Sequence, residues 1–324
     1  MSEFVHEAMP AAQAPRVRFA AGAGFETLVG LSVLTGDDGD PARVSPALRA
    51  ALAGVGEHST ELWLHLLGLA LERPDDVVAA VRATSPAELR RHLVGVHVPA
   101  WRDAVGEKAL EAAARGDTTL LDHERYYAGC ARASLERLLP LSPAETKRRV
   151  LAVLELYRDE ELDAAVVAAL ERDAAARSEL RASPAAIIAG ACPGYDYEPE
   201  PELPDVVLVP HRAASPWLLL CQHDRARIIC YPLPAPEELE DRLVVLGRAL
   251  GDPRRARMLT RLAEGDATLA ELAQATQLAK STAHHHLAHL RAAGLVEMHG
   301  NASGYWFSLR HEGLVDGGRL LRSV

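Results

Sequence analysis

The sequence has few cysteines and no long hydrophobic run. None of its four cysteines belongs to a CxxC pair, and none follows residue 230. No stretch approaches the roughly 18 apolar residues that mark a membrane span. The start, Met1–Glu7, lacks the basic and then apolar pattern of a secretory signal. We therefore expect a cytoplasmic protein with no membrane segment and with reduced thiols.

Sequence motifs of common enzyme classes are also missing. There is no G-x-S-x-G elbow, no glycine-rich phosphate loop and no H-E-x-x-H zinc motif. Carboxylates do not pair at a spacing typical of acid–base catalysis. We therefore expect that the protein is not an enzyme and needs no cofactor or resident metal.

The charge is divided unevenly along a chain long enough for two domains. At 324 residues, with 48% hydrophobic and 25% charged residues, the sequence is typical of soluble globular proteins. Residues 241–324 carry 11 Lys and Arg against 8 Asp and Glu, whereas residues 1–240 carry 24 against 37. An acidic body repels DNA, so only the mildly basic carboxy-terminal part could bind it.

Helical periodicity dominates residues 24–181. Ser85-Pro-Ala-Glu88 and Ser142-Pro-Ala-Glu145 each place a capping serine three residues before a glutamate, with proline at the first helical position. Ser45 and Ser183, each followed by proline, are weaker versions of this pattern. Apolar residues then recur every three or four positions. These patterns predict a multi-helix body.

Short strands and a domain boundary are predicted after this body. The four prolines of segment 192–204 predict a surface loop, because proline excludes both a helix and a central strand. Apolar runs at 206–209, 217–221 and 227–231 predict strands, the last two as a hairpin, and 16–20 could add another. Prolines at 232–236 place the boundary near residue 235. We expect a mainly α protein: a helical domain (1–235) with a small β element near 205–231, then a winged helix-turn-helix domain (236–324).

Residues 250–310 have the pattern of a winged helix-turn-helix. One helix is capped at Asp252, and the capping box Thr268–Glu271 begins a short second helix. A third helix is predicted from Lys280 to about Ala293, and two strands around Gly300–Gly304 form a wing. In the third helix Ala283, Leu287 and Leu290 face the core, while Ser281, Thr282, His284, His285 and Ala288 face outward. This polar face of small side chains suits the major groove of DNA.

Two segments resemble the ArsR-type winged-helix repressors. Leu250-Gly-Asp-Pro-Arg-Arg-Ala-Arg-Met-Leu259 resembles the opening of their domain, and residues 281–296 resemble their recognition helix and the turn after it. The resemblance implies a homodimer that binds double-stranded DNA sequence-specifically and represses transcription. The amino-terminal body would sense an unknown small-molecule effector or a partner. The expected DNA-binding residues are Arg255, Arg257, Lys280, Ser281, Thr282, His284 and His285, with Asn301 and Ser303 at the wing.

The chain departs from the metal-sensing members of that family. Those members carry cysteines near the recognition unit or ligands on a long carboxy-terminal helix. Here the tail offers only His311, Glu312 and Asp316, with glycines at 317 and 318. We therefore expect those metal sites to be absent, and expect the segment 239–250 and the amino-terminal body to supply the dimer interface.

Alternatives remain for several histidines and cysteines. Of the run His284–His286 with His289, only His285 and His289 have the spacing to chelate one ion, so we expect DNA contacts instead and a packed His286. His92 and His97 are interpreted as surface or capping groups rather than ligands. A thiol or metal sensor is an alternative to small buried side chains for the group Cys192, Cys221, His223 and Cys230.

The body itself also has a second interpretation. It could be an enzyme or a protein-interaction module for which the winged helix is only a tether or a dimerisation device. The hydroxyl groups and Lys280 on the predicted recognition helix favour DNA binding over this alternative.

Overall fold

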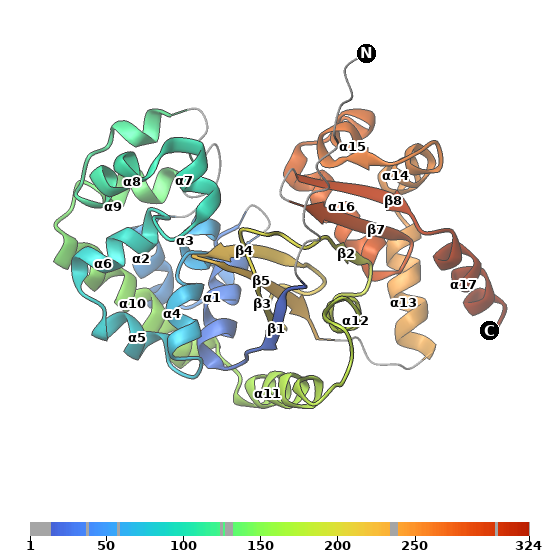
Figure 1. Ribbon diagram of the computed structural model, residues 1–324, viewed down its shortest axis with the longest axis horizontal. Coiled ribbons are helices and arrows are strands. Elements are labelled where there is room, and N and C mark those ends of the chain that lie inside the picture. Colours follow the sequence, from blue (N-terminus) through green and yellow to red (C-terminus); the bar gives the residue numbers. More distant parts are fainter. Residues whose placement is uncertain are drawn as a thin grey trace, which may run out of the picture.

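The computed structural model describes residues 14–36, 39–56, 59–123, 126, 132–233, 239–301 and 304–323. Over these residues the chain is mainly helical, which confirms the predicted fold class. Three parts lie side by side: a helical lobe, a four-stranded sheet with two flanking helices, and a carboxy-terminal unit (Figure 1). No helix in the described ranges is long and apolar enough to cross a membrane.

The helical lobe begins its helices at the serines that the sequence marks as caps. The hydroxyls of Ser45, Ser85 and Ser142 each accept the N–H of the third residue after them. The lobe consists of α1 (Ala23–Leu34), α2 (Pro46–Val55), α3 (Thr60–Leu64), α4 (Leu67–Glu72), α5 (Val77–Ala83), α6 (Pro86–Leu93), α7 (Pro99–Val105), α8 (Glu107–Ala114), α9 (Arg132–Leu138) and α10 (Pro143–Glu161), with 3-10 turns η1 (Pro41–Arg43) and η2 (Thr119–Asp122).

The glutamates of the two predicted capping boxes have other partners. Glu88 forms an ion pair with Arg91 at 2.8 Å, and Glu145 forms one with Arg148 at 2.6 Å. An arginine one turn further along the same helix face competes for each carboxylate. Glu88 therefore points along α6 toward the side chains that follow this helix.

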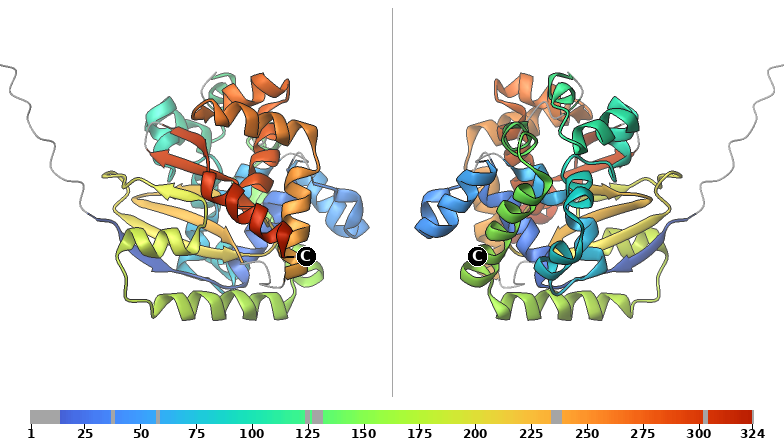
Figure 2. Two further views of the ribbon diagram at one scale, coloured as in Figure 1. Left: turned by 90° about the vertical axis from the view of Figure 1, so that its right-hand side faces the viewer. Right: turned by 90° about the vertical axis from the view of Figure 1, so that its left-hand side faces the viewer.

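The first sheet has the strand order β1 (Arg16–Phe19), β3 (Asp205–His211), β5 (Ala226–Pro232), β4 (Leu219–His223). The first three strands are parallel, and β4 is antiparallel to β5, with Leu219 opposite Cys230. The predicted hairpin is confirmed, although its first strand starts two residues later than expected. Helix α11 (Ala164–Ser178) runs along one side of this sheet, followed by α12 (Pro184–Ala191) (Figure 2).

The two central strands are buried on both faces. Val207 and Ile228 pack into the core of the helical lobe, whereas Leu208 and Ile229 pack into a second apolar cluster. That second cluster continues into the carboxy-terminal unit, where it includes Leu290. The sheet therefore connects the helical lobe to the carboxy-terminal unit through continuous apolar packing.

The carboxy-terminal unit is a winged helix-turn-helix with one helix on each side of it in the chain. Its sheet has the strand order β2 (Tyr195–Tyr197), β7 (Val296–Asn301), β8 (Gly304–Leu309), β6 (Ala267–Thr268). The elements are α13 (Leu239–Leu250), α14 (Pro253–Ala263), β6 (Ala267–Thr268), α15 (Leu269–Thr276), α16 (Lys280–Ala292), β7 (Val296–Asn301), β8 (Gly304–Leu309) and α17 (His311–Arg322).

The predicted surface loop at 192–204 is wrong in part, because β2 (Tyr195–Tyr197) lies within it. This strand pairs in parallel with β7, Tyr195 opposite Met298, at the edge of the wing sheet. Its three residues contain no proline, and an edge position tolerates the prolines on either side. The domain boundary near residue 235 stays a prediction, since 234–238 lie outside the described residues.

Candidate nucleic-acid interface

The helix-turn-helix is held together by caps and by one apolar stripe on each helix. Asp252 caps α14 by accepting the N–H of Arg254 at 2.7 Å. Thr268 and Glu271 form the complete capping box predicted for α15. The inward positions predicted for α16 are confirmed, with Ala283, Leu287 and Leu290 all buried.

The first turn of α16 carries exposed polar groups. Lys280 and Thr282 are exposed, and Ser281 lies between them in the helix. No side chain caps the start of this helix, and the free N–H groups of such a helix end favour a phosphate. This turn can therefore approach the backbone and base edges of a duplex.

The next turn of α16 is partly covered, which corrects the predicted outward face. Ala288 is 6% exposed, and the rings of His284 and His285 lie 4.9 and 5.1 Å from that of Trp217, between their centroids. Burial, with smaller contributions from Arg291 and His285, lowers the pKa of His284, so this ring is neutral at pH 7. Trp217 is far away in sequence, so helical periodicity alone could not reveal this contact.

Arg291 joins the last turn of α16 to the body. Its Nη1 donates to the carbonyl of Pro193 at 2.9 Å, and its Nη2 donates to that of Pro216 at 2.6 Å. The side chain is buried, which lowers its pKa to about 10. Nothing in the sequence marks this residue, because an arginine near a helix end usually lies in solvent.

The two arginines predicted on α14 have different surroundings. Arg255 is half-buried, and its guanidinium donates to the carbonyls of Arg248 and Ala249, at the end of α13. The same guanidinium lies 3.2 Å from Nδ1 of His286, which is buried as predicted. Arg257 is exposed. Of the two, Arg257 is thus the one open to a phosphate.

The wing is a two-stranded extension whose tip is only partly described. Asn301 ends β7, while Ser303 lies outside the described residues. His299 stacks on Trp306, with 5.5 Å between ring centroids. Its Nδ1 lies 3.2 Å from Oδ2 of Asp196, in the middle of β2. The body therefore supports one edge of the wing.

The histidines and cysteines that the sequence offers as alternative metal ligands have different surroundings. His285 and His289 approach to 3.1 Å between their Nε2 atoms, with no third ligand grouped with them in the described ranges. Burial raises the pKa of Cys192 and of Cys221 to about 12, which keeps both thiols neutral. His92 is only 6% exposed, so its interpretation as a surface group is wrong.

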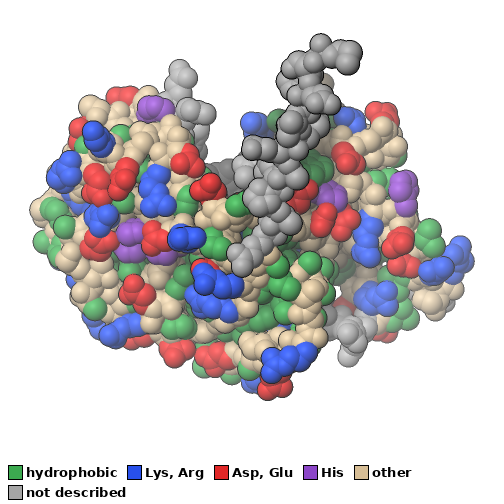
Figure 3. Space-filling view, viewed as in Figure 1, with side chains coloured by type: hydrophobic (Ala, Val, Ile, Leu, Met, Phe, Trp, Pro, Cys, Tyr) green, Lys and Arg blue, Asp and Glu red, His purple; other side chains and the backbone are tan. Residues whose placement is uncertain are grey.

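His92 belongs instead to a cluster with His97 and His223. The first two are close in sequence, whereas His223 belongs to a distant segment. The ring centroid of His92 lies 4.3 Å from that of His97 and 5.6 Å from that of His223. The fold brings the turn between β4 and β5 against the end of α6, which no local pattern indicates. Figure 3 shows one face of the molecule, on which a few histidine side chains lie among acidic and basic ones.

Comparison with known proteins identifies the carboxy-terminal unit. Residues 252–298 match the family described as bacterial regulatory protein, arsR family. No match was found among curated proteins. The matched range runs from the cap of α14 into β7, and it is an ArsR-family helix-turn-helix domain. This domain indicates DNA-binding regulation of transcription.

Proposed function

Because residues 252–298 form an ArsR-family helix-turn-helix domain, we propose that the protein is a sequence-specific, DNA-binding repressor rather than an enzyme. It acts in the cytoplasm as a homodimer that responds to a small molecule. The observation that carries the proposal is the exposed first turn of α16, with Lys280 and Thr282, on a helix whose opposite face is fixed in a core. Two such helices about 34–36 Å apart would enter successive major grooves.

DNA binding is tested with two variants of this turn. Lys280→Ala is expected to weaken binding to operator and random duplexes alike and to reduce the salt slope by about 1, because it removes a phosphate contact. Thr282→Ala is expected to reduce discrimination between the two duplexes by about 1–3 kcal/mol. The measurement is fluorescence anisotropy over a salt series, with an operator selected from random-sequence DNA.

Lys108→Ala is the matched control, since Lys108 is an exposed lysine on α8, in the helical lobe. It should bind both duplexes as the unmodified protein does. Equal affinity of the unmodified protein for selected and random DNA at every salt concentration would contradict the proposal.

The dimer interface is proposed on α13 and α17. The carboxy-terminal tail forms the helix α17, from His311 to Arg322, although it contains glycines at 317 and 318. A groove of about 330 Å³ lies between the two helices, lined in part by Leu246, Gly317 and Leu320. Most of the large apolar side chains that are exposed within the described ranges lie on these helices: Leu239, Val244, Leu250, Leu314, Val315 and Leu321. A second copy of the chain is the partner that would cover this surface.

The double variant Val315→Asp, Leu321→Asp is expected to be a monomer. Dimerisation would bury the charge of each new aspartate in the proposed interface, which costs free energy. Operator affinity should fall at least about tenfold, as the two half-sites are no longer bound together. Light scattering after size exclusion measures the mass. Leu180→Asp, at an exposed leucine after α11, is the control. A monomeric unmodified protein that still binds its operator tightly would contradict this interface.

The effector site is proposed in the apolar cleft between the helical lobe and the winged helix. The cleft has a volume of about 350 Å³, within the usual range for ligand pockets. Leu64 of α3 and Leu220 of β4 line one side of it, and His284 of α16 and Phe307 of β8 line the other. A small apolar molecule bound there would touch the recognition helix and the body together.

Leu220→Trp is expected to fill part of this cleft and to weaken binding of the fluorescent probe anilinonaphthalene sulfonate at least about tenfold, because an indole occupies space that the probe needs. The fluorescence titration includes Leu180→Trp as a control outside the cleft. Unchanged probe affinity in the Leu220→Trp variant would exclude the cleft as the binding site.

A further inference from the structure

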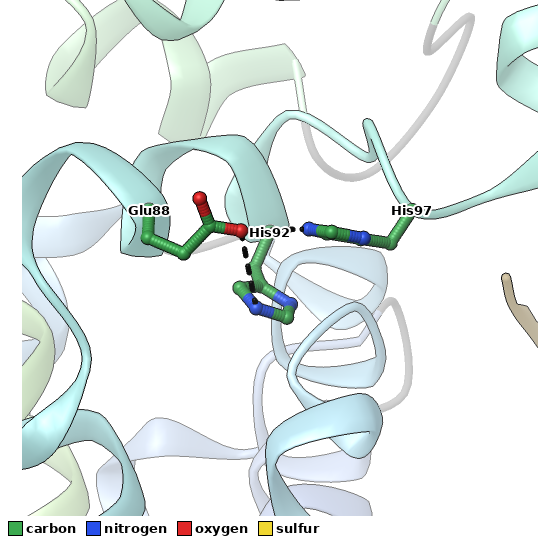
Figure 4. A group of neighbouring side chains, drawn as sticks. All are labelled: Glu88, His92 and His97. Atoms are coloured by element: carbon green, nitrogen blue, oxygen red, sulfur yellow. Dashed lines mark hydrogen bonds and ion pairs between the residues drawn. The ribbon is translucent and has the colours of Figure 1, made fainter.

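Glu88, His92 and His97 converge at the end of α6, in the helical lobe (Figure 4). Glu88 and His92 are four residues apart on one face of α6, and His97 follows the turn after it. Oε1 of Glu88 lies 3.0 Å from Nε2 of His97 and 4.0 Å from Nε2 of His92. Two ligand atoms of a tetrahedral zinc ion lie about 3.4 Å apart, which falls between these two distances.

His92 has unused binding capacity inside the protein. It is 6% exposed, and its Nδ1 has no hydrogen-bond partner among the described residues. Its Nε2 reaches Glu88 only at 4.0 Å. An ion could therefore bind at Nε2 without displacing a hydrogen-bond partner of the ring.

Asp224 supplies the second contact that a ligating histidine usually has. Its Oδ1 lies 3.2 Å from Nδ1 of His97, and its backbone N–H donates to the carbonyl of His97 at 2.7 Å. Asp224 has a left-handed backbone (φ 48°) at the turn between β4 and β5. A carboxylate on the far ring nitrogen fixes the orientation of a ligating imidazole and makes it a better donor.

His223 completes the surroundings without being needed as a ligand. It packs against Gly68, where a Cβ atom would lie 2.1 Å from its Cε1 atom, so only glycine leaves room for this ring. Its Nε2 lies 3.6 Å from Asp224, whose side chain is 55% exposed. An ion at Asp224 and His223 would be more open to water than one at the buried His92.

We propose that Glu88, His92 and His97 bind one zinc ion, with Asp224 orienting His97 and a water or another small ligand in the fourth position. Imidazole nitrogens with one carboxylate are a ligand set that suits zinc. The ion would hold His97 against α6, and the contact between His97 and Asp224 would extend this link to the turn between β4 and β5. This inference does not rest on the proposed DNA binding and can fail without affecting it.

The test uses the full-length protein, stripped of metal with a chelator and titrated with zinc chloride against a chromophoric zinc indicator. The unmodified protein should bind about one zinc ion per chain. Glu88→Gln and His97→Gln should each weaken binding by more than about 100-fold as first-sphere ligands, and Asp224→Asn by about 10–100-fold as an orienting group. Circular dichroism confirms that each variant is folded.

His285→Ala is the matched control, because His285 and His289 approach each other closely at a different place in the fold. It should bind zinc with unchanged affinity. The proposal is overturned if the unmodified protein binds no zinc at micromolar concentrations. It is also overturned if binding is lost in His285→Ala or His223→Ala but retained in the folded His97→Gln variant.

Discussion

Replacing Arg227 with alanine is expected to lower the free energy of unfolding by about 3–5 kcal/mol. Arg227 on β5 donates to both carboxylate oxygens of Glu200, at 2.8 and 2.5 Å, and the two side chains are only 5% and 6% exposed. Burial opposes the charge on Arg227, but hydrogen bonding to Glu200 raises its pKa overall. The variant would leave the carboxylate of Glu200 buried without its partner. Urea unfolding followed by circular dichroism measures the loss.

The double variant Arg227→Met with Glu200→Leu separates the cost of an unpaired charge from the value of the pair. Its stability should return to within about 1–2 kcal/mol of the unmodified protein, because replacing both buried charges removes the desolvation cost. If Arg227→Ala is as stable as the unmodified protein, water reaches Glu200 in the variant and the ion pair does not stabilise the fold.

Arg291→Ala is expected to cost about 2–4 kcal/mol, because it removes two charge-assisted hydrogen bonds and leaves two backbone carbonyls without their donor. The loss should be local, since Arg291 connects α16 to Pro193 and Pro216 at the interface with the body. Hydrogen exchange should therefore accelerate in α16 and in residues 193–218, and remain unchanged in the helical lobe.

Arg254→Ala provides the control for this experiment, because Arg254 is an exposed arginine on α14. It should leave hydrogen exchange unchanged. If Arg291→Ala accelerates exchange over the whole chain equally, the residue stabilises the global fold and does not act as a local link between the recognition helix and the body.

Many features of the winged helix could be predicted because they depend on nearby residues. The spacing of Ala283, Leu287 and Leu290 determines which face of α16 is buried, and the Thr268–Glu271 box determines where α15 begins. The serine caps of the helical lobe were predicted in the same way. Each of these contacts spans a few residues, so the sequence shows both partners together.

Contacts between distant segments were not predictable by the same means. The four prolines of segment 192–204 predict a loop, and nothing nearby in the sequence indicates β2, because its partner β7 lies about a hundred residues later. His284 was placed on an open face, because Trp217 belongs to a different part of the chain. His97 and Asp224 are 127 positions apart, so no spacing in the sequence indicates that they meet.

The sequence by itself determined the helical character of the body, the helix-turn-helix and the residues at the first turn of its recognition helix. Periodicity, caps and charge distribution are local properties that a single chain displays directly. Only the tertiary structure decided that the body covers the second turn of that helix, that β2 supports the wing, and that three histidines from two segments lie together in one cluster. Those arrangements depend on how the sheet packs against both of its neighbours, and the free energy of that packing is distributed over residues far apart in the chain.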